Sequence, residues 1–181
     1  FASCSKNFET INQPWSGSST ATLAQIYVAF VSNLALSGGD QNDDNGWLYP
    51  ITQQGMVYTH PDFGYASTGI WGNYYNNLSN YNAFMNLVAA SPDSNIYNNV
   101  KLMMKVLKAY QTIKVTDFYG DMPYSQAGNA IDYTPSNPNV LKPAYDSQQS
   151  IYISCLNDLK DAVDGFNATD PTQYSIGSSD Y

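Results

Sequence analysis

Residues 91–127 constrain the fold most, because their first two thirds have the pattern of one long amphipathic helix. Ser91 suits the N-cap, Pro92 suits the first helical position, and Asp93 places a negative charge at the positive end of the helix. Apolar side chains then recur at helical spacing, at Val100, Met103, Met104, Leu107 and Tyr110. Lysines occupy the opposite face, at Lys101, Lys105 and Lys108. We therefore predict a continuous two-faced helix over residues 91–118.

Residues 116–127 predict a helix end, a tight turn and a helical restart, because Gly120 and Pro123 both interrupt helices. Asp117 and Asp121 are the only acid pair near a turn. A glycosidase needs two carboxylates facing each other across a cleft, about 5 to 9.5 Å apart. Alternatively, the two carboxylates accept hydrogen bonds from turn amides and cap the helical restart. We favour this structural interpretation.

The same residues, TDFYGDMPYSQA, also resemble the signature of the SusD/RagB family. In that family a long helix ends in T-D-x-Y-G-D-x-P-Y-S-(E/Q)-A, and Gln126 stands where glutamate is usual. Residues 142–165 are similar to the family as well, with a Tyr-Asp pair, a glutamine-rich first turn and an L-x-D-L-x-x-A helix. The resemblance gives a structural role in the turn to six residues: Asp117, Tyr119, Gly120, Asp121, Pro123 and Tyr124.

Three further helices are predicted from apolar periodicity, over residues 20–36, 69–89 and 146–165. Asp146 and Gln149 form a D-x-x-Q capping box at the start of the last one, whose apolar stripe includes Cys155 and Val163. Four amphipathic helices without a strand pattern indicate a mainly α fold. The resemblance adds tetratricopeptide-like stacked helix pairs joined by long ordered loops. On this interpretation the corner at residues 119–124 lies outside any β-sheet.

The long connection over residues 38–68 holds the candidate ligand-binding residues. Asp40, Asn42 and Asp44 have the alternating oxygen spacing of a calcium loop, but Asn45 and Ile51 stand where that loop needs glycine and glutamate. An Asx-rich turn is the simpler interpretation. A third is hydrogen bonding to a sugar beside a stacking Trp47, a combination that suits a glycan-binding surface. Trp71 starts the next helix close to this loop and is the fifth candidate.

The composition excludes several classes of function. The chain of 181 residues carries a net charge of −8 and its basic residues are all lysine, which argues against nucleic acid and against docking on anionic lipid. His60 has no cysteine or histidine at metal-ligand spacing, and the sequence contains no nucleophile elbow, zinc-protease or phosphate-loop motif. We therefore predict no enzyme activity, no metal and no cofactor.

The N-terminus, Phe1-Ala2-Ser3-Cys4, is typical of the end of a bacterial lipoprotein signal, with Cys4 as the lipidated residue. The alternative is an ordinary cysteine at a disordered end. We expect residues 1–18 to comprise a signal remnant, the lipidated cysteine and a tether. Residues 19–181 would form the N-terminal part of a SusD-like helical domain. Cys155 falls on a predicted buried face, which favours a reduced core thiol over a bridge to Cys4.

The resemblance implies a nutrient-binding lipoprotein on the outer face of the bacterial outer membrane. Such a protein caps a SusC-type TonB-dependent transporter and passes it an oligosaccharide, or sometimes a peptide. The alternatives are a helical interaction module that only holds the transporter and, less favoured, a surface glycosidase. The sequence does not identify the ligand.

Overall fold

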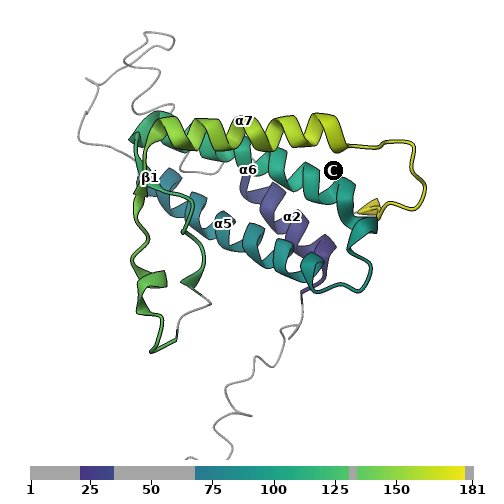
Figure 1. Cartoon of the computed structure of the whole chain (residues 1–181), viewed down its shortest axis with the longest axis horizontal. Coiled ribbons are helices and arrows are strands. Elements are labelled where there is room, and N and C mark those ends of the chain that lie inside the picture. The colour runs from purple at the N-terminus through teal and green to yellow at the C-terminus, as the bar shows by residue number, and fades with distance from the viewer. Residues whose placement is uncertain (1–20, 35–67, 131–133, 178–181) are drawn as a thin grey trace, which may run out of the picture.

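The computed structural model describes residues 21–34, 68–130 and 134–177. In these ranges it contains the helices α2 (Leu23–Leu34), α5 (Thr68–Ala89), α6 (Asn98–Tyr119) and α7 (Gln148–Gly165), with short 3-10 helices η2 (Ser94–Tyr97) and η4 (Pro138–Leu141) (Figure 1). The prediction of a mainly α fold is confirmed. The tetratricopeptide-like repeat and the division at residue 18 stay predictions.

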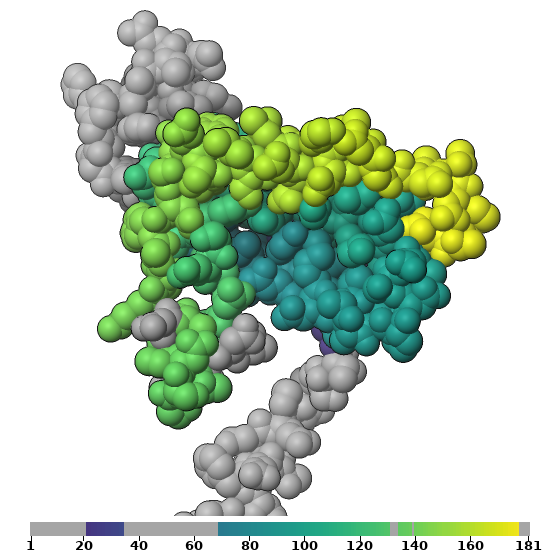
Figure 2. Space-filling model, in the orientation of Figure 1, coloured from purple at the N-terminus to yellow at the C-terminus, as the bar shows by residue number. Residues whose placement is uncertain are grey.

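Successive helices run antiparallel and pack side by side. Between α2 and α5, Asn33 hydrogen-bonds Asn77. Between α5 and α6, Tyr74 hydrogen-bonds Thr112 and Asn77 hydrogen-bonds Gln111. The start of α6 meets the end of α7, where Asn98 Nδ2 donates to the Gly165 carbonyl at 3.1 Å. Figure 2 shows α7 as a band along one edge of the molecule, lying over the teal surface of α5 and α6. Two antiparallel pairs therefore share one core through the α5–α6 contact.

The core between these helices combines aliphatic, aromatic and a few polar side chains. Its largest fully buried members are Tyr74, Phe30, Phe84, Met104, Met122 and Ile151. Asn77 is also fully buried, but its side chain donates to the Phe30 carbonyl and to Gln111 and accepts from Asn33. A buried amide with three partners avoids the cost of an unsatisfied polar group. It also joins three helices at one point.

The predicted start of α6 is wrong. Ser91, Pro92 and Asp93 lie in a turn, η2 follows, and the α-helix begins at Asn98 with Tyr97 as N-cap and no side-chain cap. The reason lies beyond the local sequence: the Asn99 N–H donates to Gln173 Oε1 at 3.0 Å. The segment after α7, yellow in Figure 1, folds back over this helix end and supplies the acceptor that a local cap would have given.

The two faces of α6 also differ from the prediction. Tyr110 is 60 % exposed, whereas Lys108 is largely buried beside Asp158 of α7, with Nζ to Oδ2 at 3.3 Å. The lysine face is therefore the face on which α7 packs, because the aspartates of α7 neutralise it. On α7 itself Cys155 is buried and unpaired as predicted, but Val163 is 82 % exposed.

The corner after α6 contains a minimal sheet where we expected none. Strand β1 (Met122–Pro123) pairs antiparallel with β2 (Tyr145–Asp146), with Met122 opposite Asp146 and Pro123 opposite Tyr145. No helix restarts at Tyr124; residues 125–128 form a turn. The Asp146 capping box is also wrong, because Ser147 is the N-cap of α7 and accepts from the Ser150 N–H.

Candidate functional site

The corner begins where α6 ends at a glycine with positive φ. Gly120 has φ 72°, and its N–H donates to the Thr116 carbonyl at 2.7 Å. The Thr116 hydroxyl donates in turn to the Gly120 carbonyl at 2.7 Å. Glycine adopts this conformation without the steric penalty that a side chain brings. The chain therefore leaves the helix through a closed, hydrogen-bonded loop.

The corner and the start of α7 hold each other through carboxylates. Asp121 Oδ1 accepts the N–H of Gln148, the first residue of α7, at 2.8 Å. Asp146 Oδ2 accepts the N–H groups of Tyr124 at 3.0 Å and Ser125 at 2.8 Å. Burial raises the pKa of Asp146, but the hydrogen bonds from Ser125 and Tyr124 outweigh it, so the pKa lies below the usual 3.8. The carboxylate is the form that this contact stabilises.

Asp117 also faces α7, where its carboxylate accepts the hydroxyl of Tyr152. That hydrogen bond is the main reason why the pKa of Tyr152 is raised. Asp117 and Asp121 are therefore both engaged by donors from α7. Asp121 does cap a helix start, but that helix is α7 and not the expected restart within the corner.

An aromatic cluster packs against the corner. The half-buried Trp71 of α5 lies edge-on to Tyr75 at 4.9 Å and to Tyr119 at 5.0 Å between ring centroids. Tyr75 donates its hydroxyl to the Pro123 carbonyl in β1 at 2.9 Å, and burial raises the pKa of Tyr75. Tyr145, opposite Pro123 in the ladder, is 67 % exposed. The corner thus has one half-buried aromatic side chain, Trp71, and one exposed one, Tyr145, beside a hydrogen-bonded backbone.

The remaining candidates from the sequence are only partly testable. Trp71 is in the aromatic cluster, next to Tyr119 of the family turn. The other five lie outside the described residues: Cys4, Asp40, Asn42, Asp44 and Trp47. Whether they approach Trp71 stays a prediction.

In the described ranges no three histidine, cysteine or acidic side chains are grouped so that they could bind a metal ion. None of the helices described there is long and apolar enough to cross a membrane.

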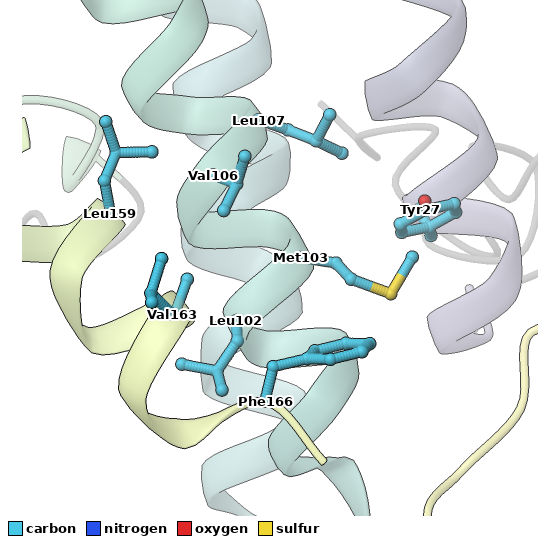
Figure 3. A pocket seen from close by; sticks show the side chains of 9 residues that line it. Tyr27, Leu102, Met103, Val106, Leu107, Leu159, Val163 and Phe166 are labelled. Carbon is cyan, nitrogen blue, oxygen red and sulfur yellow. The ribbon is translucent and has the colours of Figure 1, made fainter. Parts of the chain in front are cut away.

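A second feature, an apolar groove of about 480 Å³, was missed by the sequence analysis. Its floor is α6, and its walls are α7 and α2, as Figure 3 shows. Met103 and Phe166 line this groove and also an adjoining hollow of about 320 Å³. The available signal was the breadth of the apolar arc on α6, where Leu102 and Val106 extend it beyond the stripe we predicted.

Residues 13–180 match the family model for SusD-like proteins, described as starch-binding and associating with the outer membrane. The chain belongs to the SusD-like family. No curated protein and no solved structure matches it significantly.

The family is one of binding proteins, so outer-membrane association and glycan or nutrient binding are the functions that membership implies. In this SusD-like chain the signature residues of the turn contact α7 and the aromatic cluster. Those contacts pack the helix exit against α5 and α7.

Proposed function

We propose that this SusD-like chain belongs to a nutrient-binding lipoprotein that caps a SusC-type TonB-dependent transporter and passes it an oligosaccharide or, less favoured, a peptide. The family match over residues 13–180 carries this proposal. The family description names starch and the outer membrane. Capping of the transporter and transfer of the ligand go beyond that description.

The proposed ligand site combines Trp71 with Asp40, Asn42, Asp44 and Trp47. The aromatic cluster supports it, because Trp71 is fixed by Tyr75 and Tyr119 and is not fully buried. A ring that neighbouring rings hold in place loses little conformational entropy when a sugar stacks on it. Asp and Asn side chains would complete the site by hydrogen-bonding sugar hydroxyls.

Isothermal titration with maltoheptaose, a soluble starch fragment, tests the site, and a glycan array extends the test to other ligands. Trp71→Ala, Trp47→Ala and Asn42→Ala are expected to weaken binding at least tenfold. Tyr110→Ala is the control, since Tyr110 is an aromatic residue 60 % exposed on α6 and outside the cluster. Unchanged affinity in the first three variants would remove these residues from the site.

Anchoring and capping need a separate experiment in cells. Cys4→Ala is expected to release the protein from the outer membrane and to abolish its co-purification with the transporter. Retained co-purification without binding of any glycan or peptide would favour the interaction module instead. Hydrolysis of a natural glycan that Asp121→Asn abolishes would favour the glycosidase.

A further inference from the structure

Three side-chain amides, one from each of three helices, are hydrogen-bonded in series inside the bundle. Asn33 of α2 donates through Nδ2 to Asn77 Oδ1 at 3.0 Å. Asn77 of α5 donates through Nδ2 to Gln111 Oε1 of α6 at 3.3 Å. Asn77 is fully buried and Gln111 is 9 % exposed. This amide series therefore runs from the last turn of α2 into the core.

One backbone carbonyl fixes the orientation of the whole amide series. Asn77 Nδ2 also donates to the Phe30 carbonyl at 3.2 Å, and a carbonyl accepts only from the nitrogen of an amide. Asn77 Oδ1 therefore faces Asn33, which has to present its Nδ2. Asn77 Nδ2 faces Gln111, which has to present its Oε1. Turning over any one of the three amides would bring two donors or two acceptors together.

The two ends of the amide series present polar atoms of opposite kind. In the part of the chain that the structure describes, no donor reaches Asn33 Oδ1 and no acceptor reaches Gln111 Nε2. An unpaired amide donor is costly at a side chain that is nine-tenths buried, as Gln111 is. A group that accepts from Gln111 is therefore expected.

Asn33 and Gln111 both line one small notch between the end of α2, the start of α5 and the C-terminal half of α6. Its volume is about 20 Å³. A single water molecule needs about 10 to 15 Å³ of cavity, so the notch has room for one water and is too small for a sugar ring. Lys114 also lines the notch but already has a partner.

The chemistry of the two ends selects a neutral group that both accepts and donates. An anion would accept from Gln111 Nε2 but would be repelled by Asn33 Oδ1, and a cation would have the opposite difficulty. Water does both through one oxygen atom. We propose that the notch binds one water molecule, which accepts from Gln111 Nε2 and donates to Asn33 Oδ1.

This water closes the amide series into a ring. Asn33 donates to Asn77, Asn77 to Gln111, Gln111 to the water and the water to Asn33, so every hydrogen bond points the same way round. Hydrogen bonds arranged in such a series polarise and strengthen one another. The water is thus a structural ligand that ties the last turn of α2 to α5 and α6.

Water–protein NOESY and ROESY spectra of the ¹⁵N-labelled chain test the site directly. The side-chain amide protons of Gln111 are expected to show water cross-peaks of opposite sign in the two spectra, which is the signature of a bound water. Proton exchange with bulk water gives the same sign in both. Asn82 is the internal control, because its Nδ2 donates to the Ala127 carbonyl and to Asn129 Oδ1 within the protein. Its amide protons should show no such peaks.

Two neighbouring substitutions on α2 locate the water. Asn33→Ala removes the acceptor and one wall of the notch, so the cross-peaks at Gln111 should be lost. Ser32→Ala is the matched control, and it should keep these peaks. Ser32 is exposed like Asn33, donates its hydroxyl to the Ala29 carbonyl within α2 and does not line the notch. Circular dichroism checks that both variants are folded.

Two results would overturn the proposal. Cross-peaks at Gln111 that are missing, or that have the same sign in both spectra, would mean that no water stays bound there. This result comes from the parent chain and needs no variant. Peaks of opposite sign that persist in folded Asn33→Ala would show that Asn33 does not hold the water. Neither result bears on the glycan site at Trp71, because no glycan is present in these spectra.

Discussion

Asp121 and Asp146 each cap the segment that carries the other. Asp121, in the corner, accepts the N–H of Gln148 at the start of α7, and Asp146, just before α7, accepts two N–H groups of the corner. Asp146 is itself part of the two-residue ladder between β1 and β2, where it lies opposite Met122. Each carboxylate therefore satisfies backbone donors that the opposite segment leaves without a local acceptor. This arrangement explains why a helix exit so rich in turn residues stays ordered.

We expect Asp146→Asn to destabilise the protein by about 1 to 3 kcal/mol. The amide has one acceptor oxygen and no charge, whereas the carboxylate accepts from two N–H groups and the Ser125 hydroxyl. Urea unfolding followed by circular dichroism measures the change. Asp164→Asn is the control: Asp164 pairs with Lys160 on the exposed side of α7, so its loss should cost no more than about 0.5 kcal/mol. Equal effects would contradict the capping role.

The Asp146 carboxylate also makes the stability of the fold depend on pH, in a direction that follows from its lowered pKa. Because the folded-state pKa of Asp146 is lowered from 3.8, its contribution is complete above about pH 5. The contribution is lost as the pH falls through 3.8 and then through the folded-state pKa. The difference in unfolding free energy between the parent protein and Asp146→Asn should therefore shrink below pH 4. Taking this difference cancels the contributions of the other aspartates to the pH dependence. Asp161 and Asp170 are among them, since their pKa values are also lowered. A constant difference between pH 7 and pH 3 would contradict this assignment.

Periodicity predicted the helices well, and local capping signals predicted their ends poorly. The helix over 69–89 is α5, which begins one residue earlier. Ser91 and Asp146 both have the chemistry of helix caps, but neither serves as one. At the start of α6 a distant residue, Gln173, supplies the contact. The start of α7 has a local cap one residue later than predicted, Ser147, and Asp121 adds a distant one. A cap rule that considers four consecutive residues has no access to such partners.

Side-chain charge misled the analysis at Lys108 for a related reason. Lysine on a helix is usually solvated, so the face that carries Lys105 and Lys108 was predicted to lie opposite the buried one. In the fold that face meets α7. There the Asp158 carboxylate lies 3.2 Å from Lys105 Nζ through Oδ1 and 3.3 Å from Lys108 Nζ through Oδ2. Tyr110 and Val163 are correspondingly exposed. Which face of a helix is buried depends on the helix that packs against it. The periodicity of one helix carries no information about that partner.

Alanine substitutions at Gly128 and Gly120 compare the cost of overpacking with the cost of backbone strain. Both have positive φ, 77° and 72°. An added Cβ meets nothing within 4 Å at Gly120, but at Gly128 it would lie 2.7 Å from Asn82 Nδ2 and 3.1 Å from Leu78. Gly120→Ala should cost about 1 to 3 kcal/mol from the backbone alone, because φ 72° with ψ −127° is a conformation that residues other than glycine rarely adopt. Gly128→Ala should cost at least about 1 kcal/mol more, through overpacking. Urea denaturation of both variants measures the difference, and equal losses would mean that Asn82 moves aside freely.

Lys108 provides the last prediction, because it stabilises the fold from inside the α6–α7 contact. Its ammonium group lies 4.9 Å from the ring centroid of Tyr81 and 4.8 Å from that of Tyr124, and it pairs with Asp158. Lys108→Met keeps the aliphatic stem but removes the charge, so both cation–π contacts are lost. Asp158 keeps Lys105 as a partner, which limits the cost of leaving a carboxylate half-buried.

We therefore expect Lys108→Met to lower the unfolding free energy by about 1 to 3 kcal/mol. Lys160→Met, which breaks only an exposed pair on α7, should change it by less than about 0.5 kcal/mol. Thermal and urea unfolding at low and high salt separate the two positions, since the exposed pair is screened and the buried one is screened much less. If methionine at 108 were neutral, neither the cation–π contacts of Lys108 nor its pair with Asp158 would contribute to the stability of the α6–α7 contact.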